Sequence, residues 1–221
     1  MNLIFPLWLC ISLPILIVLY ILGIFFKNGY LLKHKALAKY YVLPKCAGSY
    51  LCVSGAALAI VCHGESPLSH LPFWVLILCF AGDFFIEIHI MAGGIFFGLA
   101  HCLLMVYALT LARLHFYSLL IWAAGIFAAL IVFRKNIPSM GRLFLPFILY
   151  ITVLTGDFAL ALPLVWTAKP RYIFLAAGLL CFIISDMLLG KRYFGARQPW
   201  VSRLLMLFYY SALYLIQISL W

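Results

Sequence analysis

The chain has 221 residues, of which 68% are hydrophobic and only 9% are charged, and it carries a formal net charge of +10. Its mean hydropathy is +1.18. A soluble domain of this size cannot bury that much apolar surface, so a soluble globular protein is excluded. In lipid every backbone N–H and C=O must be paired within the protein, and uninterrupted apolar runs of about 18–24 residues select helices over a barrel.

The apolar runs predict an all-α bundle of about eight transmembrane helices, forming a single integral-membrane domain over residues 1–221. The predicted spans are 3–26, 44–62, 71–88, 90–112, 116–133, 143–165, 171–190 and 203–221. The first run lacks a basic flank and a small-residue cleavage site, so it is interpreted as a span and not as a signal peptide. The mix of apolar, aromatic and lysine residues in 27–43 predicts a short helix lying on the membrane surface.

The basic residues predict the orientation of the bundle. Twelve of the fifteen lie on one side: Lys27, Lys33, Lys35, Lys39, Lys45, Arg134, Lys135, Arg142, Lys191, Arg192, Arg197 and Arg203. Arg113, Lys169 and Arg171 lie on the other. Because Lys and Arg are retained in cytoplasmic loops, both termini are expected on the non-cytoplasmic side, most simply in a bacterial inner membrane. The positive charge therefore needs no nucleic-acid partner.

Four of the five acidic residues fall within predicted spans: Asp83, Glu87, Asp157 and Asp186. A carboxylate in hydrocarbon costs a few kcal/mol, so such residues usually face the bundle interior and serve a function. The alternative is a purely structural hydrogen bond between helices, worth about 1 kcal/mol.

Helical rise gives the depth of each group. Asp83 is six residues from His89, or roughly 9 Å, and Asp186 is five residues from Lys191, or roughly 7.5 Å, so the two are expected in one layer below the cytoplasmic headgroups. Asp157, at roughly 22 Å from Arg142, is expected in the other leaflet, without an assigned role. The remaining candidates are placed as follows: Tyr150, Tyr209 and Tyr210 near the aspartate layer, Glu87 at the surface, and His101 near the midplane.

Two neighbouring carboxyl groups in a poorly hydrated site do not both ionise easily, so one keeps its proton. The protonated group is a general acid and the ionised group a general base. If the helices bring Asp83 and Asp186 together, the pair supports acid–base chemistry without a metal or cofactor.

Three segments resemble a known family. AGDFF (81–85) with GIFFGLAH (94–101), CFIISDMLL (181–189) and YYSALYLI (209–216) are similar to the signatures of the YhhN-like lysoplasmalogenase family. The resemblance implies an eight-helix hydrolase that cleaves the vinyl ether bond of lysoplasmalogens to a fatty aldehyde and a glycerophospho-base. It also implies that Asp83 and Asp186 are catalytic, and that His101, Tyr209 and Tyr210 belong to the pocket.

Vinyl ether hydrolysis begins with protonation of the β-carbon, which gives an oxocarbenium ion that water then attacks. We expect Asp186 to deliver the proton and Asp83 to activate water, or the reverse, because a coupled pair titrates as a unit. Lys45, Lys191 or Arg192 is expected to hold the lipid phosphate, unless these cations only set the topology.

Other functions remain open at this stage. Buried carboxylates also suit a small proton-coupled transporter, and a lipid-binding membrane protein without activity is a third possibility. A pocket that opens sideways to lipid favours the hydrolase. The expected partners are the lysophospholipid and membrane lipids, and the sequence does not distinguish a monomer from a homodimer. Gly93, Gly94 and Gly98 are interpreted as helix-packing positions.

Overall fold

The computed structural model describes residues 3–28, 40–63, 70–111, 114–167, 169–195 and 198–221. Within them, eight helices are long and apolar enough to cross a bilayer, which confirms the predicted all-α membrane bundle. The predicted spans agree with these helices to within a few residues at each end. Most of the surface helix predicted for 27–43 lies outside the described residues, as do Lys33, Lys35, Lys39, Arg113 and Arg197.

The spanning helices follow one another with short connections. Their bounds are α1 (Ile4–Asn28), α2 (Val42–His63), α3 (Leu71–Ile88), α4 (Ile90–Leu111), α5 (Phe116–Phe133), α7 (Phe144–Ala161), α8 (Pro170–Phe194) and α9 (Pro199–Ile218). A short helix, α6 (Ile137–Met140), and a 3₁₀ turn, η3 (Gly141–Leu143), precede α7, and a second 3₁₀ segment, η4 (Leu162–Thr167), extends it.

Local sequence explains several helix ends. Pro170 and Pro199 open α8 and α9, where the missing N–H and fixed φ of proline are suited to a first helical position. Gly141 has φ of +51°, a left-handed conformation that L side chains rarely adopt. It lies where the chain turns from α6 into α7. Only His89, in an extended conformation, separates α3 from α4.

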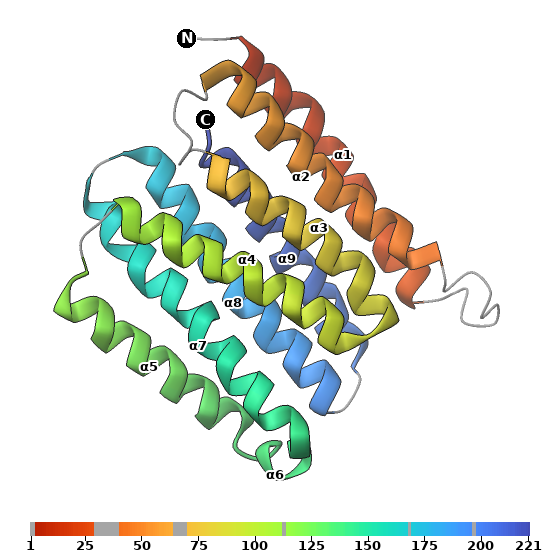
Figure 1. Ribbon diagram of the computed structural model, residues 1–221. Coiled ribbons are helices and arrows are strands. Elements are labelled where there is room, and N and C mark those ends of the chain that lie inside the picture. Colours follow the sequence, from red (N-terminus) through yellow and green to blue (C-terminus); the bar gives the residue numbers. More distant parts are fainter. Residues whose placement is uncertain (1–2, 29–39, 64–69, 112–113, 168, 196–197) are drawn as a thin grey trace.

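The helices pack as a compact bundle, with α8 along α9 and α3 along α4 (Figure 1). Gly178 permits the close approach of α8 to α9, because a Cβ there would lie 3.1 Å from the carbonyl oxygen of Ala212. α4 packs against α7, whereas α5 and α1 lie at the outside of the bundle and contact chiefly α7 and α2, respectively.

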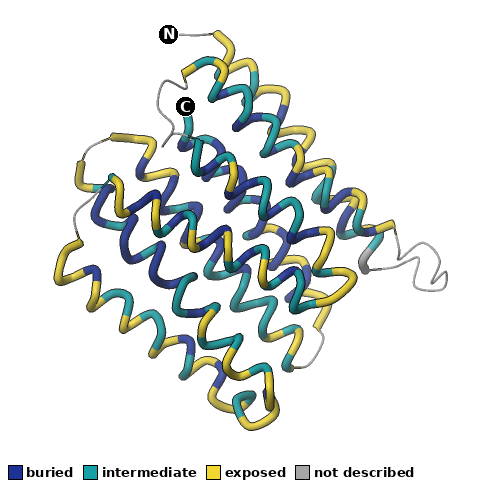
Figure 2. Tube along the Cα trace, viewed as in Figure 1, coloured by how far each residue is buried: buried dark blue, intermediate teal, exposed yellow. Residues whose placement is uncertain are grey.

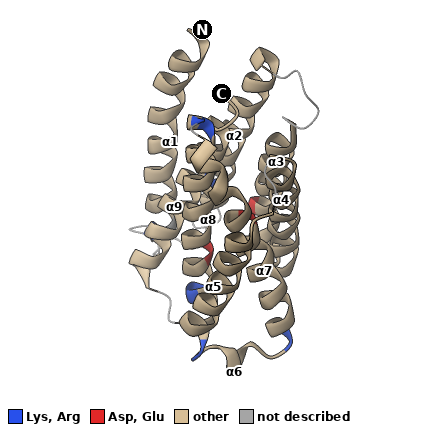
Figure 3. Ribbon diagram, turned by 90° about the vertical axis from the view of Figure 1, so that its left-hand side faces the viewer, with Lys and Arg blue, Asp and Glu red and all other residues tan. Residues whose placement is uncertain are grey.

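Burial follows the pattern expected in lipid. The faces between helices are buried, and the outer faces carry exposed large apolar side chains (Figure 2). Both termini lie at one end of the bundle and α6 at the other (Figure 1). Lys and Arg residues gather mainly at the α6 end (Figure 3), and Asp83 and Asp157 are buried inside the bundle. Which end faces the cytoplasm stays a prediction from the basic residues.

Candidate active site

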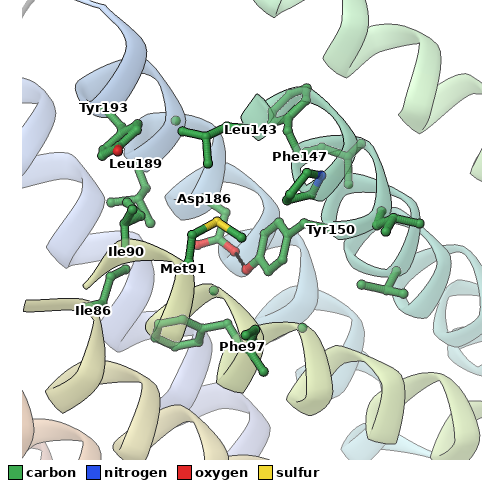
Figure 4. Close-up of a pocket in the computed structure, with 18 of the residues that line it drawn as sticks. Ile86, Ile90, Met91, Phe97, Leu143, Phe147, Tyr150, Asp186, Leu189 and Tyr193 are labelled. Carbon is green, nitrogen blue, oxygen red and sulfur yellow. Dashed lines mark hydrogen bonds between the residues drawn. The ribbon is translucent and has the colours of Figure 1, made fainter. Parts of the chain in front are cut away.

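A cavity of about 440 Å³ lies between α4, α7 and α8, near the end of the bundle that carries α6 (Figure 4). Its wall is apolar apart from Asp186 and the hydroxyl groups of Tyr150 and Tyr193. The lining residues from α4 run from Ile90 to Cys102, which lie twelve positions or roughly 18 Å apart along the helix. One leaflet of a hydrocarbon core about 30 Å thick is about 15 Å deep. The cavity therefore has the length of one lipid chain in its leaflet.

The cavity opens toward the lipid-facing side of the bundle. Ile95, Leu99 and Leu149 line it and are each at least half exposed. These side chains belong to the outer faces of α4 and α7, so the opening lies between these two helices. Tyr193, at the end of α8, is also exposed and marks the end of the cavity near α6. The sideways opening is the feature that favours a lipid substrate.

Two glycines of α4 widen this cavity. A Cβ at Gly94 would meet no atom within 4 Å, and one at Gly98 would meet only Tyr150 at 3.8 Å. The prediction that both are helix-packing positions is therefore wrong. Gly93 does pack closely, since a Cβ there would lie 2.6 Å from the Cα of Ile86. Neighbouring helical positions point about 100° apart, so adjacent glycines serve different faces.

Asp186 is the carboxyl group of the cavity. Its Oδ2 accepts a hydrogen bond from the Tyr150 hydroxyl, and both side chains lie at the centre of the close-up (Figure 4). Among the described residues, no hydrogen bond is made to Oδ1 of Asp186. One oxygen of this carboxyl is therefore fixed by a donor, and the other is available to a molecule in the cavity.

Behind Asp186 lies a buried imidazole. His101 Nδ1 is 2.6 Å from Oδ2 of Asp157, and its Nε2 is 3.8 Å from Oδ2 of Asp186. His101 and Asp157 are both fully buried. His101 thus links Asp157 to Asp186, a contact that the depths estimated from the sequence did not indicate, whereas the leaflet in which Asp157 lies stays a prediction.

The depths measured from the observed helix ends, together with the reach of the side chains, explain why His101 contacts both aspartates. α8 continues to Phe194, so Asp186 is roughly 12 Å deep, His101 roughly 16 Å from Ile90, and Asp157 roughly 20 Å from the start of α7. Each step of about 4 Å is short enough for the imidazole to bridge the two carboxyl groups.

Asp83 belongs to a second polar cluster, which we call the Lys45 cluster: Lys45, Ser49, Asp83, Glu87 and Tyr209. Lys45 Nζ is 3.4 Å from Oδ1 of Asp83 and 3.2 Å from Oε1 of Glu87. Oδ2 of Asp83 accepts hydrogen bonds from Ser49 and, at 2.7 Å, from Tyr209. Asp83 is fully buried, so its charge is compensated inside the protein, whereas Glu87 is exposed.

Aromatic rings stand between the two carboxyl sites. Phe182 lies 4.6 Å from the His101 ring and 5.7 Å from the Tyr209 ring, measured between centroids. Phe97 lies 5.9 Å from Tyr209 and forms part of the cavity wall. Within the described part of the chain, no hydrogen bond joins Asp83 to Asp186. The two aspartates thus occupy neighbouring sites with different partners.

Most of the predicted site residues lie either at the cavity or in the Lys45 cluster. Asp186 and Tyr150 line the cavity. His101 lies directly behind Asp186, and Lys45, Glu87 and Tyr209 surround Asp83. The hydroxyl of Tyr210 donates to the backbone oxygen of Pro44 at 3.0 Å, at the start of α2.

The sequence prediction missed two contributors to these sites. One is Asp157, and the other is Ser49. The signal for Ser49 was present, because it lies four residues after Lys45 on the same helical face.

These features define a class of protein: a multi-pass α-helical membrane protein with an acidic group in a lipid-facing cavity. The model of the YhhN family matches residues 40–220, and the chain belongs to this family. The match includes seven of the eight spans and leaves out α1. No curated protein and no solved structure is significantly similar to the chain.

Proposed function

We propose that the protein hydrolyses the vinyl ether bond of lysoplasmalogens, releasing a fatty aldehyde and a glycerophospho-base. The observation that carries the proposal is the placement of Asp186 in an apolar cavity that opens sideways to lipid. The resemblance to lysoplasmalogenases and the family match support the same reaction. A single-chain lipid suits a cavity with the length of one chain in one leaflet.

In its protonated form, Asp186 donates from Oδ1 to the β-carbon of the vinyl ether and becomes a carboxylate. The bound lipid becomes an oxocarbenium ion, which the new carboxylate stabilises electrostatically. Water then adds to the cation, and Asp186 recovers a proton from that water. The resulting hemiacetal collapses to aldehyde and alcohol, so the carboxyl group ends as it began.

Asp83 contributes through charge in this proposal. The Lys45 cluster holds two carboxyl groups against one ammonium group, so with both ionised it carries a net negative charge. Phe97 contacts Tyr209 of this cluster and lines the cavity, and a water-poor site weakens screening. A net negative charge on this cluster stabilises a cationic transition state in the neighbouring cavity.

The lipid headgroup is proposed to lie at the α6 end of the cavity. Arg142 precedes the lining residue Leu143, and Lys191 follows the lining residue Gly190. Both cations are exposed, whereas Lys45 is buried against Asp83 and Glu87. The phosphate contact is therefore assigned to Arg142 and Lys191 in place of Lys45.

Purified protein in nanodiscs should release aldehyde from choline and ethanolamine lysoplasmalogens. The matched saturated alkyl-ether lysolipids, which lack the double bond that accepts the proton, should give none. Asp186→Asn should abolish release, and Thr155→Val, which removes a buried hydroxyl from α7 near Asp157, should retain it. Absence of release by folded wild-type protein with either headgroup would refute the proposal.

A proton-coupled carrier is the second candidate, favoured by the buried His101 between two carboxyl groups. A carrier would move protons together with a solute across sealed proteoliposomes, without aldehyde formation. A pH-sensitive dye inside the vesicles, read while lysolipid is added outside, distinguishes this function from the hydrolase.

A further inference from the structure

Asp157 and His101 have no part in the steps above, although both are fully buried in the middle of the bundle. The imidazole is placed between two carboxyl groups, with Nδ1 at 2.6 Å from Asp157 and Nε2 at 3.8 Å from Asp186. Burial of such groups is costly unless they are paired. Their arrangement therefore needs an explanation beyond packing.

Every titratable group facing the imidazole is an acid. Asp157 and Tyr150 approach from α7 and Asp186 from α8, and Cys79 on α3 lies within electrostatic range of both aspartates. Phe182 covers the ring edge-on at 4.6 Å. No cation of the described residues pairs with Asp157 other than His101.

Both ring nitrogens point at carboxyl oxygens, which are acceptors. A doubly protonated imidazole matches this arrangement, because only that form has a donor on each nitrogen. Nδ1–H then donates to Asp157, which holds the ring in place and balances its charge. Nε2 makes no hydrogen bond among the described residues, and the carboxyl oxygen near it, at 3.8 Å, is Oδ2 of Asp186, the same oxygen that accepts from Tyr150. Oδ1 of Asp186 is left for the proton that is transferred.

We propose that Asp157 and His101 form a buried ion pair whose Nε2–H stabilises the Asp186 carboxylate created when its proton moves to the lipid carbon. The inference rests on the proposed hydrolysis. Neutral Asp186 interacts weakly with the Tyr150 hydroxyl and with the imidazolium 3.8 Å away, whereas the carboxylate strengthens the Tyr150 hydrogen bond and attracts the imidazolium charge. The stabilisation therefore appears during proton transfer. Asp157 and His101 are positioning residues, since neither lines the cavity.

The first test is the pH profile of aldehyde release by Asp157→Asn. The Asn side chain keeps the shape but not the charge, so His101 loses its counter-ion and becomes neutral. The Asp186 carboxylate formed during proton transfer then has no cation behind it. The expected result is a fall in kcat of about 10-fold or more, with a pH profile of kcat that differs from that of wild type. His101→Gln should behave in the same way, and Thr155→Val should leave the profile unchanged.

The second test needs no substrate. In protein labelled with ¹⁵N-histidine, the His101 signal is assigned by its loss in His101→Gln. We expect an imidazolium signal in wild-type protein between about pH 6 and pH 8, and a neutral imidazole in Asp157→Asn. A neutral His101 in the wild-type protein would overturn the inference, even if the Asn variant failed to fold.

The outcomes separate this inference from the proposed function. An active wild-type enzyme whose Asp157→Asn variant keeps the wild-type pH profile overturns the inference alone. A folded wild-type protein that releases no aldehyde overturns the proposed function, and with it the catalytic part of the inference.

Discussion

Asp83 and Asp186 look alike in the sequence, but the structure gives them opposite surroundings. Asp186 lines a cavity that opens to lipid, and one of its oxygens has no hydrogen bond among the described residues. Asp83 is closed off, with Lys45 on one oxygen and Ser49 and Tyr209 on the other. A buried carboxyl group held by an ion pair and two hydrogen bonds stabilises the structure or contributes to the electric field, whereas a carboxyl group in a cavity with a single hydrogen bond can react.

The largest effect is expected from Asp186→Asn. An amide cannot donate a proton as an acid, so kcat should fall by about 10²- to 10⁴-fold. The amide oxygen still accepts from Tyr150, so the free energy of unfolding should change by less than about 1 kcal/mol. Aldehyde release and unfolding in SDS-containing mixed micelles measure the two quantities. Asp83→Asn, in contrast, should lower both activity and stability. An Asp186→Asn variant with near-normal aldehyde release would show that Asp186 is not the acid.

The Lys45 cluster should respond most strongly in stability. Lys45→Met leaves Asp83 buried without its counter-charge, which costs about 3–5 kcal/mol. The double variant Lys45→Met with Asp83→Leu replaces both partners by apolar groups and should recover most of that loss. Unfolding of the single and double variants in mixed micelles gives the comparison. If the single variant is as stable as wild type, the ion pair does not stabilise this cluster.

Tyr150→Phe tests the donor at the cavity carboxyl. Loss of a hydrogen bond to an ionised group costs about 1.5–3 kcal/mol, so kcat should fall about 10- to 100-fold. Substrate affinity should change little, because the bond strengthens only once Asp186 is charged. Steady-state kinetics separate kcat from KM. A change confined to KM would show that Tyr150 only shapes the cavity.

The smallest effect is expected from Gly94→Leu, which places a side chain in open cavity space. For a long-chain lysoplasmalogen, kcat/KM should fall about tenfold, and the loss should shrink as the chain is shortened. Val106→Phe is a matched control, because Val106 is on α4, faces outward and is not part of the cavity wall. Equal losses for every chain length would place the lipid chain elsewhere.

The sequence was sufficient for the fold. Apolar runs of spanning length indicate which segments are helices, because lipid leaves the backbone no other choice. The sequence also supplied the two aspartates, through burial cost and family resemblance.

The sequence could not show which groups meet. Helical rise gives depth but not the direction in which a side chain faces, so Asp157 was separated from Asp186 although His101 bridges them. For the same reason Gly94 and Gly93 were treated alike, although one faces the cavity and the other faces α3. Lys45 was likewise one of three cations considered for the phosphate, because the sequence pattern does not reveal that Asp83 and Glu87 already surround it.

The central claim is that Asp186 delivers a proton to carbon, and hydrolysis in D₂O tests it most directly. The carboxyl proton exchanges with solvent before turnover, so mass spectrometry of the rapidly trapped aldehyde should find one deuterium at the carbon next to the carbonyl. Aldehyde incubated alone for the same time measures background exchange. Enzymatic aldehyde without that deuterium would contradict protonation at carbon, and with it the role of Asp186.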